Sequence, residues 1–545
     1  MPAPELEWKV FEVPAEAARP PGALRVAAPA AEPIAVELPD LTAFFMPLDK
    51  ARILLETAAE VEHALLVQYL YATFGLRDGE EVGEPERAAT LDAWGGQLRR
   101  IARQEMGHLM TVQNLLIALG SPPNLEREDF PPRKDLYPFP LHLEPLTQRS
   151  LAKYVVAEAP AGAEDIDDIA ALAIASAGAR VNRVGVLYGL LGVVFSTPDE
   201  LAAGGSGSNE WDAWLRLLAA AAHKQAPAPA WHLDDGAIDQ GALGRQAQPG
   251  RWQRGNTVHV VSARADAREA IRDVAEEGEG ISGGGAESHF SRLRDMYRGT
   301  GETLPFPAAG EWVPARAVPT DPRPDGVAEP RTRRWMQLAD IRYALLLGAI
   351  EHHLLITDED ARDTLAAWAF TEMFALHALA EKVAMLPAGG GVGAVPFTLP
   401  ASLHLPAEDR DRWQLHIART RAAIEQVDEM RTADPEDAAD GELSAMREDD
   451  EARLRLMSSG PAPPPATTSF ARDILALFRA IDIEHMNDQV GMDLGDLDVV
   501  RGSASSISRR LKGIGGRRMP PPPDPPLTDA QIELFDRWVA EGFPP

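Results

Sequence analysis

A carboxylate and an imidazole lie one helical turn apart within a long, apolar segment of this chain. Residues 88–119 have the periodic apolar residues of a helix that ends at Gly120, just before two prolines. Glu105 and His108 are three positions apart, so they face the same side of that helix. Apolar residues occupy this side too: Ile101, Leu109, Val112 and Leu116. The pair therefore points into a core, where a buried carboxylate and imidazole need a partner such as a metal ion.

A second carboxylate lies in a segment that is apolar on all sides. The pattern of residues 48–77 predicts a long, largely buried helix, and Glu62 lies among its apolar residues. A buried glutamate is rare without a partner, which is either a buried Arg or Lys or a metal ion. Tyr69 and Tyr71 follow Glu62 by about two turns. Each is a catalytic candidate that lines a pocket or relays electrons, with packing as the alternative role.

Further candidate ligands follow in a later pair of predicted helices. By helical geometry Glu279 lies nearest the apolar face of its helix, Glu276 lies at the edge of that face and Glu277 lies outside it. His289 opens the next helix and supplies a second imidazole. The alternatives are a solvated run of acidic residues and a structural histidine. We therefore take Glu276, Glu279 and His289 as candidate metal ligands beside Glu62, Glu105 and His108.

The composition limits both the metal and the partners. The 545 residues include no cysteine, which excludes disulfides, zinc–thiolate sites, iron–sulfur clusters and covalently attached haem. His and carboxylate ligands remain, and these suit iron, manganese or zinc. A net charge of −30 disfavours nucleic acid as a partner. Neither a signal peptide nor an apolar run of about 18 residues is evident. We therefore expect a cytoplasmic protein without a membrane partner.

Changes in composition divide the chain into expected regions, and helix-forming residues predominate. Aromatic residues make up only 6% of the chain, which favours a mainly α fold. The expected regions are an extended N-terminal arm (1–40), a metal-binding bundle (41–300) with a loop-rich insertion (203–262), an accessory helical region (301–432), an acidic and Pro-rich linker (433–467) and a small helical unit (468–545).

The candidate ligands also carry a resemblance to a known family. The segments AEVEHALLVQYLYA, RQEMGHLMTVQNLLIALGSP, EEGEG and ESHF are similar, in this order, to the ferritin-like domain of the iminophenyl-pyruvate dimer synthases of the violacein and rebeccamycin pathways. The resemblance covers residues 55–119 and 268–297. It implies a ferritin-like four-helix bundle, elaborated here by additional helices, with metal ligands at Glu62, Glu105, His108, Glu279 and His289. The pathway enzymes are longer than this chain, and the family commonly has Gln where this chain has Glu277.

The end of the chain resembles the last half of a small cytochrome c domain. It has a Met-Pro segment followed by a short terminal helix that bears an aromatic residue. The segment Ile481–His485 keeps the histidine of the haem-attachment motif but lacks both cysteines. The resemblance implies that His485 and Met519 are ligands of a non-covalently bound haem. The alternative, which we favour, is a haem-free unit in which His485 is structural or exposed.

Two more groups mix metal-binding residue types. They are Glu351, His352 and His353, and further along Glu372, His377 and Glu381. Adjacent residues of a helix point in different directions, so His352 and His353 do not converge on one ion. We interpret both groups as polar residues on helix surfaces.

The leading hypothesis for function is an oxidoreductase in which a di-iron site activates dioxygen or peroxide. Manganese is the alternative metal. The substrate would be a small organic molecule, such as an imine derived from an amino acid in a secondary-metabolite pathway. The competing hypotheses are an iron-storage or metal-holding protein and a scaffold that kept the fold without the metal. The sequence leaves open whether the protein forms a homo-oligomer.

Overall fold

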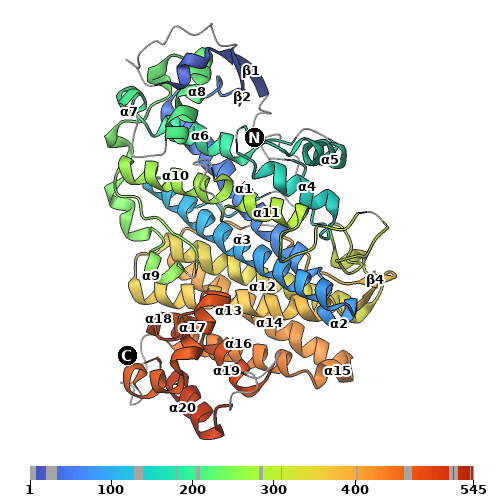
Figure 1. Cartoon of the computed structure of the whole chain (residues 1–545). Helices are drawn as coiled ribbons and strands as arrows, with labels where there is room; N and C mark the ends of the chain where they lie inside the picture. Colours follow the sequence, from blue (N-terminus) through green and yellow to red (C-terminus); the bar gives the residue numbers. More distant parts are fainter. Residues whose placement is uncertain are drawn as a thin grey trace. The chain divides into compact units, whose positions relative to one another are not determined.

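The structure is a computed structural model with two compact units. One unit comprises Met1–Gln246 and Val258–Arg316, and the other comprises Ala247–Thr257 and Ala317–Pro545. The described residues are 8–19, 33–127, 139–160, 162–178, 181–203, 209–253, 255–280, 287–308, 310–399, 403–459, 469–514, 519–520, 526–540 and 542–543. Helices dominate both units (Figure 1), which confirms the predicted mainly α fold.

The first unit is built around two long helices. Its elements are β1 (Trp8–Val13), β2 (Ile34–Pro39), α1 (Pro47–Phe74), α2 (Gly79–Val82), α3 (Pro85–Ala118), α4 (Gln148–Ala157), α5 (Asp167–Ala177), α6 (Val184–Val194), α7 (Pro198–Ala203), α8 (Asn209–Gln225), α10 (Arg264–Glu279) and α11 (His289–Arg298). Helices α1 and α3 pack along each other (Figure 1), and both also contact other helices of the unit. Because α1 is covered on all sides, polar residues in its middle are buried with the apolar ones.

The N-terminal region differs from the expected arm. Strands β1 and β2 pair antiparallel, from Trp8 opposite Pro39 to Val13 opposite Ile34. Val36 and Leu38 alternate toward one face of this sheet and are buried, and the sheet packs against α8. Helix α8 lies in the region expected as a loop-rich insertion, and it packs against α6 as well. Strands β1 and β2 and helix α8 therefore belong to the packed part of the first unit, whereas residues 247–257 of the expected insertion belong to the second unit.

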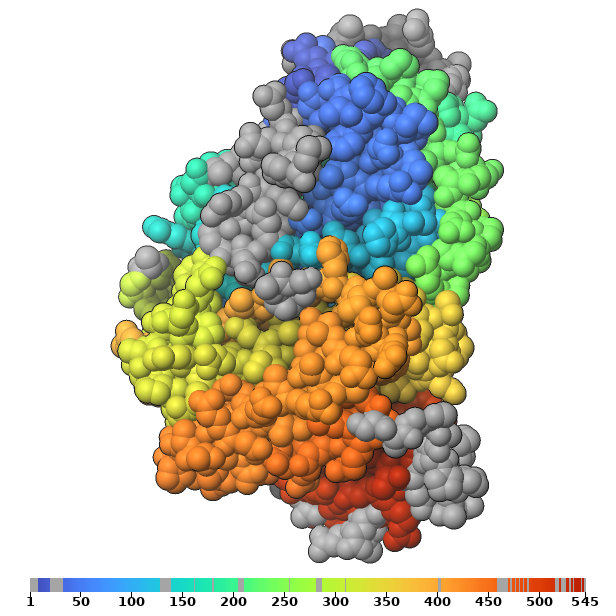
Figure 2. Space-filling view, turned by 180° about the vertical axis from the view of Figure 1, so that it is seen from behind, coloured from blue at the N-terminus to red at the C-terminus, as the bar shows by residue number. Residues whose placement is uncertain are grey.

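The second unit is also helical. Its elements are α9 (Pro249–Trp252), α12 (Pro330–Leu355), α13 (Glu359–Val383), β3 (Pro387–Ala388), β4 (Gly391–Val392), α14 (Asp409–Ala433), α15 (Pro435–Ala438), α16 (Gly441–Ser459), α17 (Ala480–Val490), α18 (Leu497–Gly502), α19 (Ala504–Lys512) and α20 (Asp529–Ala540). The space-filling view shows the orange helices α14 and α16 as one continuous surface of this unit (Figure 2). In the described part of the chain, no helix combines the length and the hydropathy that crossing a bilayer requires.

The linker expected over residues 433–467 is corrected for most of its length. Residues 435–438 and 441–459 form α15 and α16, and α16 packs against α14. The acidic residues of this segment are compatible with packed helices because several of them pair with buried cationic side chains. Asp450 accepts two hydrogen bonds from the Arg342 guanidinium, at 2.8 and 2.6 Å. Residues 460–467 of the expected linker lie outside the described residues.

Candidate metal centre

Four segments of the first unit bring acidic residues and histidines together in its core. Glu62 lies in the middle of α1, and Glu105 and His108 lie in α3. Glu279 is the last residue of α10, where Gly280 adopts a left-handed conformation (φ 68°) and ends the helix. His289 is the first residue of α11, whose preceding residue Ser288 caps the helix. All five predicted residues are buried, and Glu158, which follows α4, is buried with them.

The distances show that these side chains converge. His108 Nδ1 lies 3.1 Å from Glu105 Oε2 and 3.4 Å from Glu62 Oε2. His289 Nδ1 lies 3.2 Å from Glu105 Oε1 and 3.8 Å from Glu158 Oε1. One ligand atom each from Glu105, His108 and His289 lies within 4.8 Å of the others. Glu62 and Glu279 line one pocket together with Glu105 and His108.

Among the residues that the structure describes, several buried atoms of this cluster find no hydrogen-bond partner, which makes the donor set a good fit for a metal. They are Glu62 Oε2, Glu105 Oε1, Glu279 Oε1 and both ring nitrogens of His289. An unsatisfied buried polar atom is destabilising, and several in one place are rare in a folded protein. A cation bound among these oxygen and nitrogen atoms would satisfy them, and both ligand types suit iron and manganese.

The charges of the cluster shift the pKa values of its members in opposite directions. Burial, followed by the neighbouring Glu105, raises the pKa of Glu62 to about 8, and burial raises the pKa of Glu279 well above its usual range. Burial opposes the charge of His289, but Glu105 and Glu158 outweigh it and raise its pKa to about 9. Burial also opposes the charge of Glu105, whose pKa is nevertheless lowered by His289 and His108. Without a metal, protons bound to these carboxylates and imidazoles would therefore offset the negative charge of the cluster.

Glu277 corrects one sequence-based expectation. We predicted that it lies outside the inner face of α10, but its Oε2 lies 3.0 Å from His108 Nε2. Gln104 also donates a hydrogen bond to Glu277. The prediction was wrong because α3 packs beside α10 and reaches this edge of the helix. The other candidate at the edge, Glu276, is half-buried, and its charge acts on Glu279 rather than on the histidines.

Tyrosines contact the carboxylates, though not all those expected. The Tyr69 hydroxyl donates to Glu158 Oε1 at 2.7 Å, so Tyr69 reaches the cluster through a carboxylate that we did not predict. Tyr71 is buried and lies near Tyr154 instead. Tyr188 of α6 donates to Glu62 Oε1 and lines the pocket.

Sequence reasoning missed Glu158 and Tyr188 for different reasons. Glu158 follows the run Val155–Ala157 and precedes Ala159, so it is an isolated acidic residue among apolar ones. The same criterion identified Glu62, and it would have identified Glu158 too. Tyr188 lies in an apolar helix where a tyrosine is ordinary, and only the packing of α6 against α1 brings it to Glu62.

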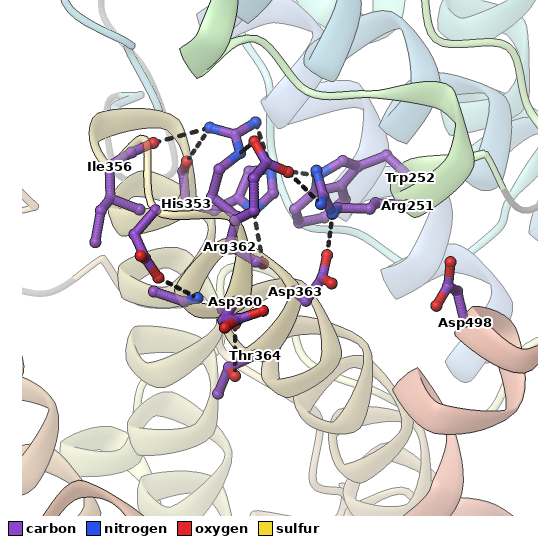
Figure 3. Close-up of polar contacts among 12 residues, drawn as sticks. Arg251, Trp252, His353, Ile356, Asp360, Arg362, Asp363, Thr364 and Asp498 are labelled. Carbon is purple, nitrogen blue, oxygen red and sulfur yellow. Dashed lines mark hydrogen bonds and ion pairs between the residues drawn. The ribbon is translucent and has the colours of Figure 1, made fainter. Parts of the chain in front are cut away.

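The histidines and acidic residues of the second unit were predicted to lie on helix surfaces, and for four of them this is wrong. Glu351, His352, His353 and Glu372 are all buried. Helix α12 packs against both α13 and α14, so it has no broad exposed face. Figure 3 shows His353 between Trp252 and Arg362. His377 and Glu381 lie at the surface as predicted and form an ion pair of 3.3 Å.

The two candidate haem ligands differ in exposure. His485 is exposed on α17, and Met519 is half-buried with its amide donating to the carbonyl of Arg510 at 3.0 Å. Around them, aromatic and aliphatic residues form a core of their own, in which Phe535 and Trp538 are fully buried. The pairing of His485 with Met519 on a haem stays a prediction.

Comparisons with known proteins agree with this geometry. Residues 55–298 match the family model described as Ferritin-like, and these residues form a ferritin-like domain that contains the whole cluster. The chain is 26% identical over 331 residues to dichlorochromopyrrolate synthase from Lentzea aerocolonigenes. That match covers 54% of this chain but only 30% of the relative, so the chain spans less than a third of the relative's length. No solved structure matches the chain significantly. The predicted fold and the resemblance to imine dimer synthases are thereby confirmed.

Proposed function

We propose that the ferritin-like domain binds iron, as a di-iron centre, and oxidises or couples a small organic substrate, such as an amino-acid-derived imine, in a secondary-metabolite pathway. The similarity to dichlorochromopyrrolate synthase supports the substrate class. The observation that carries the proposal is the convergence of buried carboxylate and imidazole atoms that lack hydrogen-bond partners.

The ligand set that we propose combines four carboxylates and two imidazoles. Di-iron proteins of this fold use a glutamate from each of two helices and a Glu-x-x-His pair from each of two others. Here Glu62 and Glu158 are the single glutamates, and Glu105 and His108 form one pair. Glu279 and His289 take the place of the second pair across the break between α10 and α11. Iron held by such ligands would supply electrons for the reduction of dioxygen or peroxide.

The protein's own residues would orient the ligands and manage protons. Glu277 accepts from His108 Nε2, so Nδ1 of this histidine is left to face the pocket as a ligand atom. Burial favours the protonated forms of Glu62 and Glu279 in the absence of metal, and both would release a proton as the metal binds. The burial of the cluster keeps bulk water away from the reacting atoms.

Metal analysis of the purified protein tests this proposal. We expect one to two iron or manganese ions per chain in the wild type, where about two ions correspond to a fully occupied di-iron site. We expect a severe loss of metal in His289→Ala. The matched control is His353→Ala, which removes an equally buried histidine from the second unit and is expected to leave the metal content unchanged. Wild-type protein without metal after reconstitution would overturn the proposal. Iron-loaded protein that consumes neither dioxygen nor peroxide would favour a metal-holding role.

A further inference from the structure

Helix α6 contributes none of the proposed ligands, yet its first turn contacts two of them. The Tyr188 hydroxyl donates to Glu62 Oε1, and Gly185 lies directly against the carboxylate of Glu279. Gly185 and Tyr188 are three positions apart, so both lie on the face of α6 that borders the pocket. One helical turn thus connects the carboxylate of α1 with that of α10.

Tyr188 binds one carboxylate oxygen of Glu62 and leaves the other to face the proposed metal ligands. Its hydroxyl binds Oε1, while Oε2 lies 3.4 Å from His108 Nδ1 and has no hydrogen-bond partner. The phenol therefore fixes the carboxylate in the orientation that presents Oε2 to the ligand atoms of His108 and Glu105. Hydrogen bonds of this kind, from outside the ligand set, hold first ligands in place and strengthen metal binding.

Gly185 allows Glu279 to approach the start of the same helix. An added Cβ at this position would lie 1.9 and 2.0 Å from the two carboxylate oxygens of Glu279. Any larger residue would therefore displace that carboxylate. The amides in the first turn of a helix have no partner within the helix, so the Gly185 amide is free to hold Glu279.

We propose that the first turn of α6 is a clamp that orients Glu62 and Glu279 for the metal, with Tyr188 as a positioning residue. This inference rests on the proposed metal site and adds to it a helix that no sequence motif marked. Tyr69 makes the corresponding contact with Glu158, but of these two tyrosines only Tyr188 also lines the pocket.

The first test uses cobalt(II) as a spectroscopic probe, without any substrate. Tyr188→Phe keeps the ring and removes the donor. We expect its cobalt affinity to fall by about 10- to 100-fold, and we expect the visible spectrum of the bound cobalt to change because Glu62 is no longer fixed. The matched control is Tyr154→Phe, a fully buried tyrosine whose hydroxyl has no hydrogen-bond partner. Affinity and spectrum unchanged in Tyr188→Phe would overturn the clamp.

The second test targets the glycine. Gly185→Ala is expected to weaken cobalt binding by at least the same factor, because the new methyl group displaces Glu279. Gly96→Ala is its control, since an added Cβ at Gly96 in α3 meets no atom within 4 Å. Wild-type protein that binds cobalt, with Gly185→Ala and Tyr188→Phe indistinguishable from it, would overturn the clamp alone. Wild-type protein that binds neither iron nor cobalt would overturn the metal site and the clamp together. If Gly185→Ala does not fold, Tyr188→Phe decides.

Discussion

The two histidines of the candidate metal centre and His353 of the second unit are buried in opposite surroundings. In the first unit, carboxylates surround His108 and His289 and raise the pKa of both, to about 9 for His289, against the effect of burial. In the second unit, burial and the neighbouring Arg362 lower the pKa of His353 to about 3. Both kinds of histidine are almost completely buried, so burial alone does not distinguish a ligand from a structural residue.

Hydrogen bonding separates the two cases more clearly. His353 accepts a hydrogen bond from Trp252 Nε1 at 2.9 Å, and its Nδ1 donates to the carbonyl of Arg362 at 2.9 Å. Figure 3 shows this arrangement, in which Arg362 also donates to the carbonyl of Ile356. Among the described residues, neither ring nitrogen of His289 makes a hydrogen bond, although Nδ1 lies 3.2 Å from Glu105 Oε1. Both ring nitrogens of His353 are therefore satisfied by the protein, whereas those of His289 are available to a metal under the proposed function. The difference predicts that mutations change stability in the second unit and metal binding in the first.

The largest effect is expected from the buried ion pair of the second unit. Asp450→Ala leaves the Arg342 guanidinium buried without its bidentate partner, and such a loss costs about 3–5 kcal/mol. Glu372 lies 3.5 Å from Arg342 and still offsets part of its charge in the variant. We therefore expect a loss of unfolding free energy at the lower end of this range. Urea denaturation measures this loss, and metal content should be unchanged.

A surface ion pair of the same unit is the control. Asp428 accepts from Arg447 at 2.7 Å but its side chain is 50% exposed, so Asp428→Ala should cost at most about 1 kcal/mol. Equal effects of the two substitutions would show that the buried pair does not stabilise the second unit as the comparison requires.

The same contrast explains what the sequence could and could not predict. The burial of Glu62, Glu105, His108 and Glu279 was predicted correctly because helical periodicity alone tells which side of a helix is apolar. The roles of Glu277 and Tyr188 were not, because they depend on which helix packs against which edge. His352 was misjudged because its buried ring is satisfied by His416 and Asp409, which lie more than 50 positions further along the chain. Periodicity predicts which side chains of a single helix face the core. Which side chains of other elements they meet there depends on long-range packing, which periodicity does not show.

The next effect concerns pH and sharpens the contrast in the first unit. The pKa of Glu62 is raised from 4.5 to about 8 and that of His289 from 6.5 to about 9. Both protons are bound more tightly in the folded state, so their contribution to stability is complete below about pH 4.5 and about pH 6.5 respectively, and it is lost as the pH rises toward the folded values. The metal-free protein should therefore lose stability between about pH 4.5 and about pH 9.

Metal binding should show the opposite trend, because the metal displaces the same protons. Each proton released increases the affinity about tenfold per pH unit, or about 1.4 kcal/mol. Thermal melts with and without a chelator at about pH 6 and about pH 8 measure the stabilisation by metal. We expect it to grow with pH in wild-type protein and in His353→Ala, and to be absent in His289→Ala. A stabilisation that does not vary with pH would contradict the proton exchange.

The smallest effect is expected at His485, the candidate haem ligand of the second unit. His485 is exposed on α17. A haem that is not covalently attached needs an apolar pocket around its ligands. The space nearby is filled by a core that includes Phe470, Phe535 and Trp538, whose rings contact one another. His485→Ala should change the unfolding free energy by no more than about 0.5 kcal/mol, as is usual for a surface position. Addition of hemin to the full chain should give no stoichiometric Soret band. A band that appears in wild-type protein and disappears in both His485→Ala and Met519→Ala would contradict this. It would show that a histidine of the second unit also binds a metal-containing group.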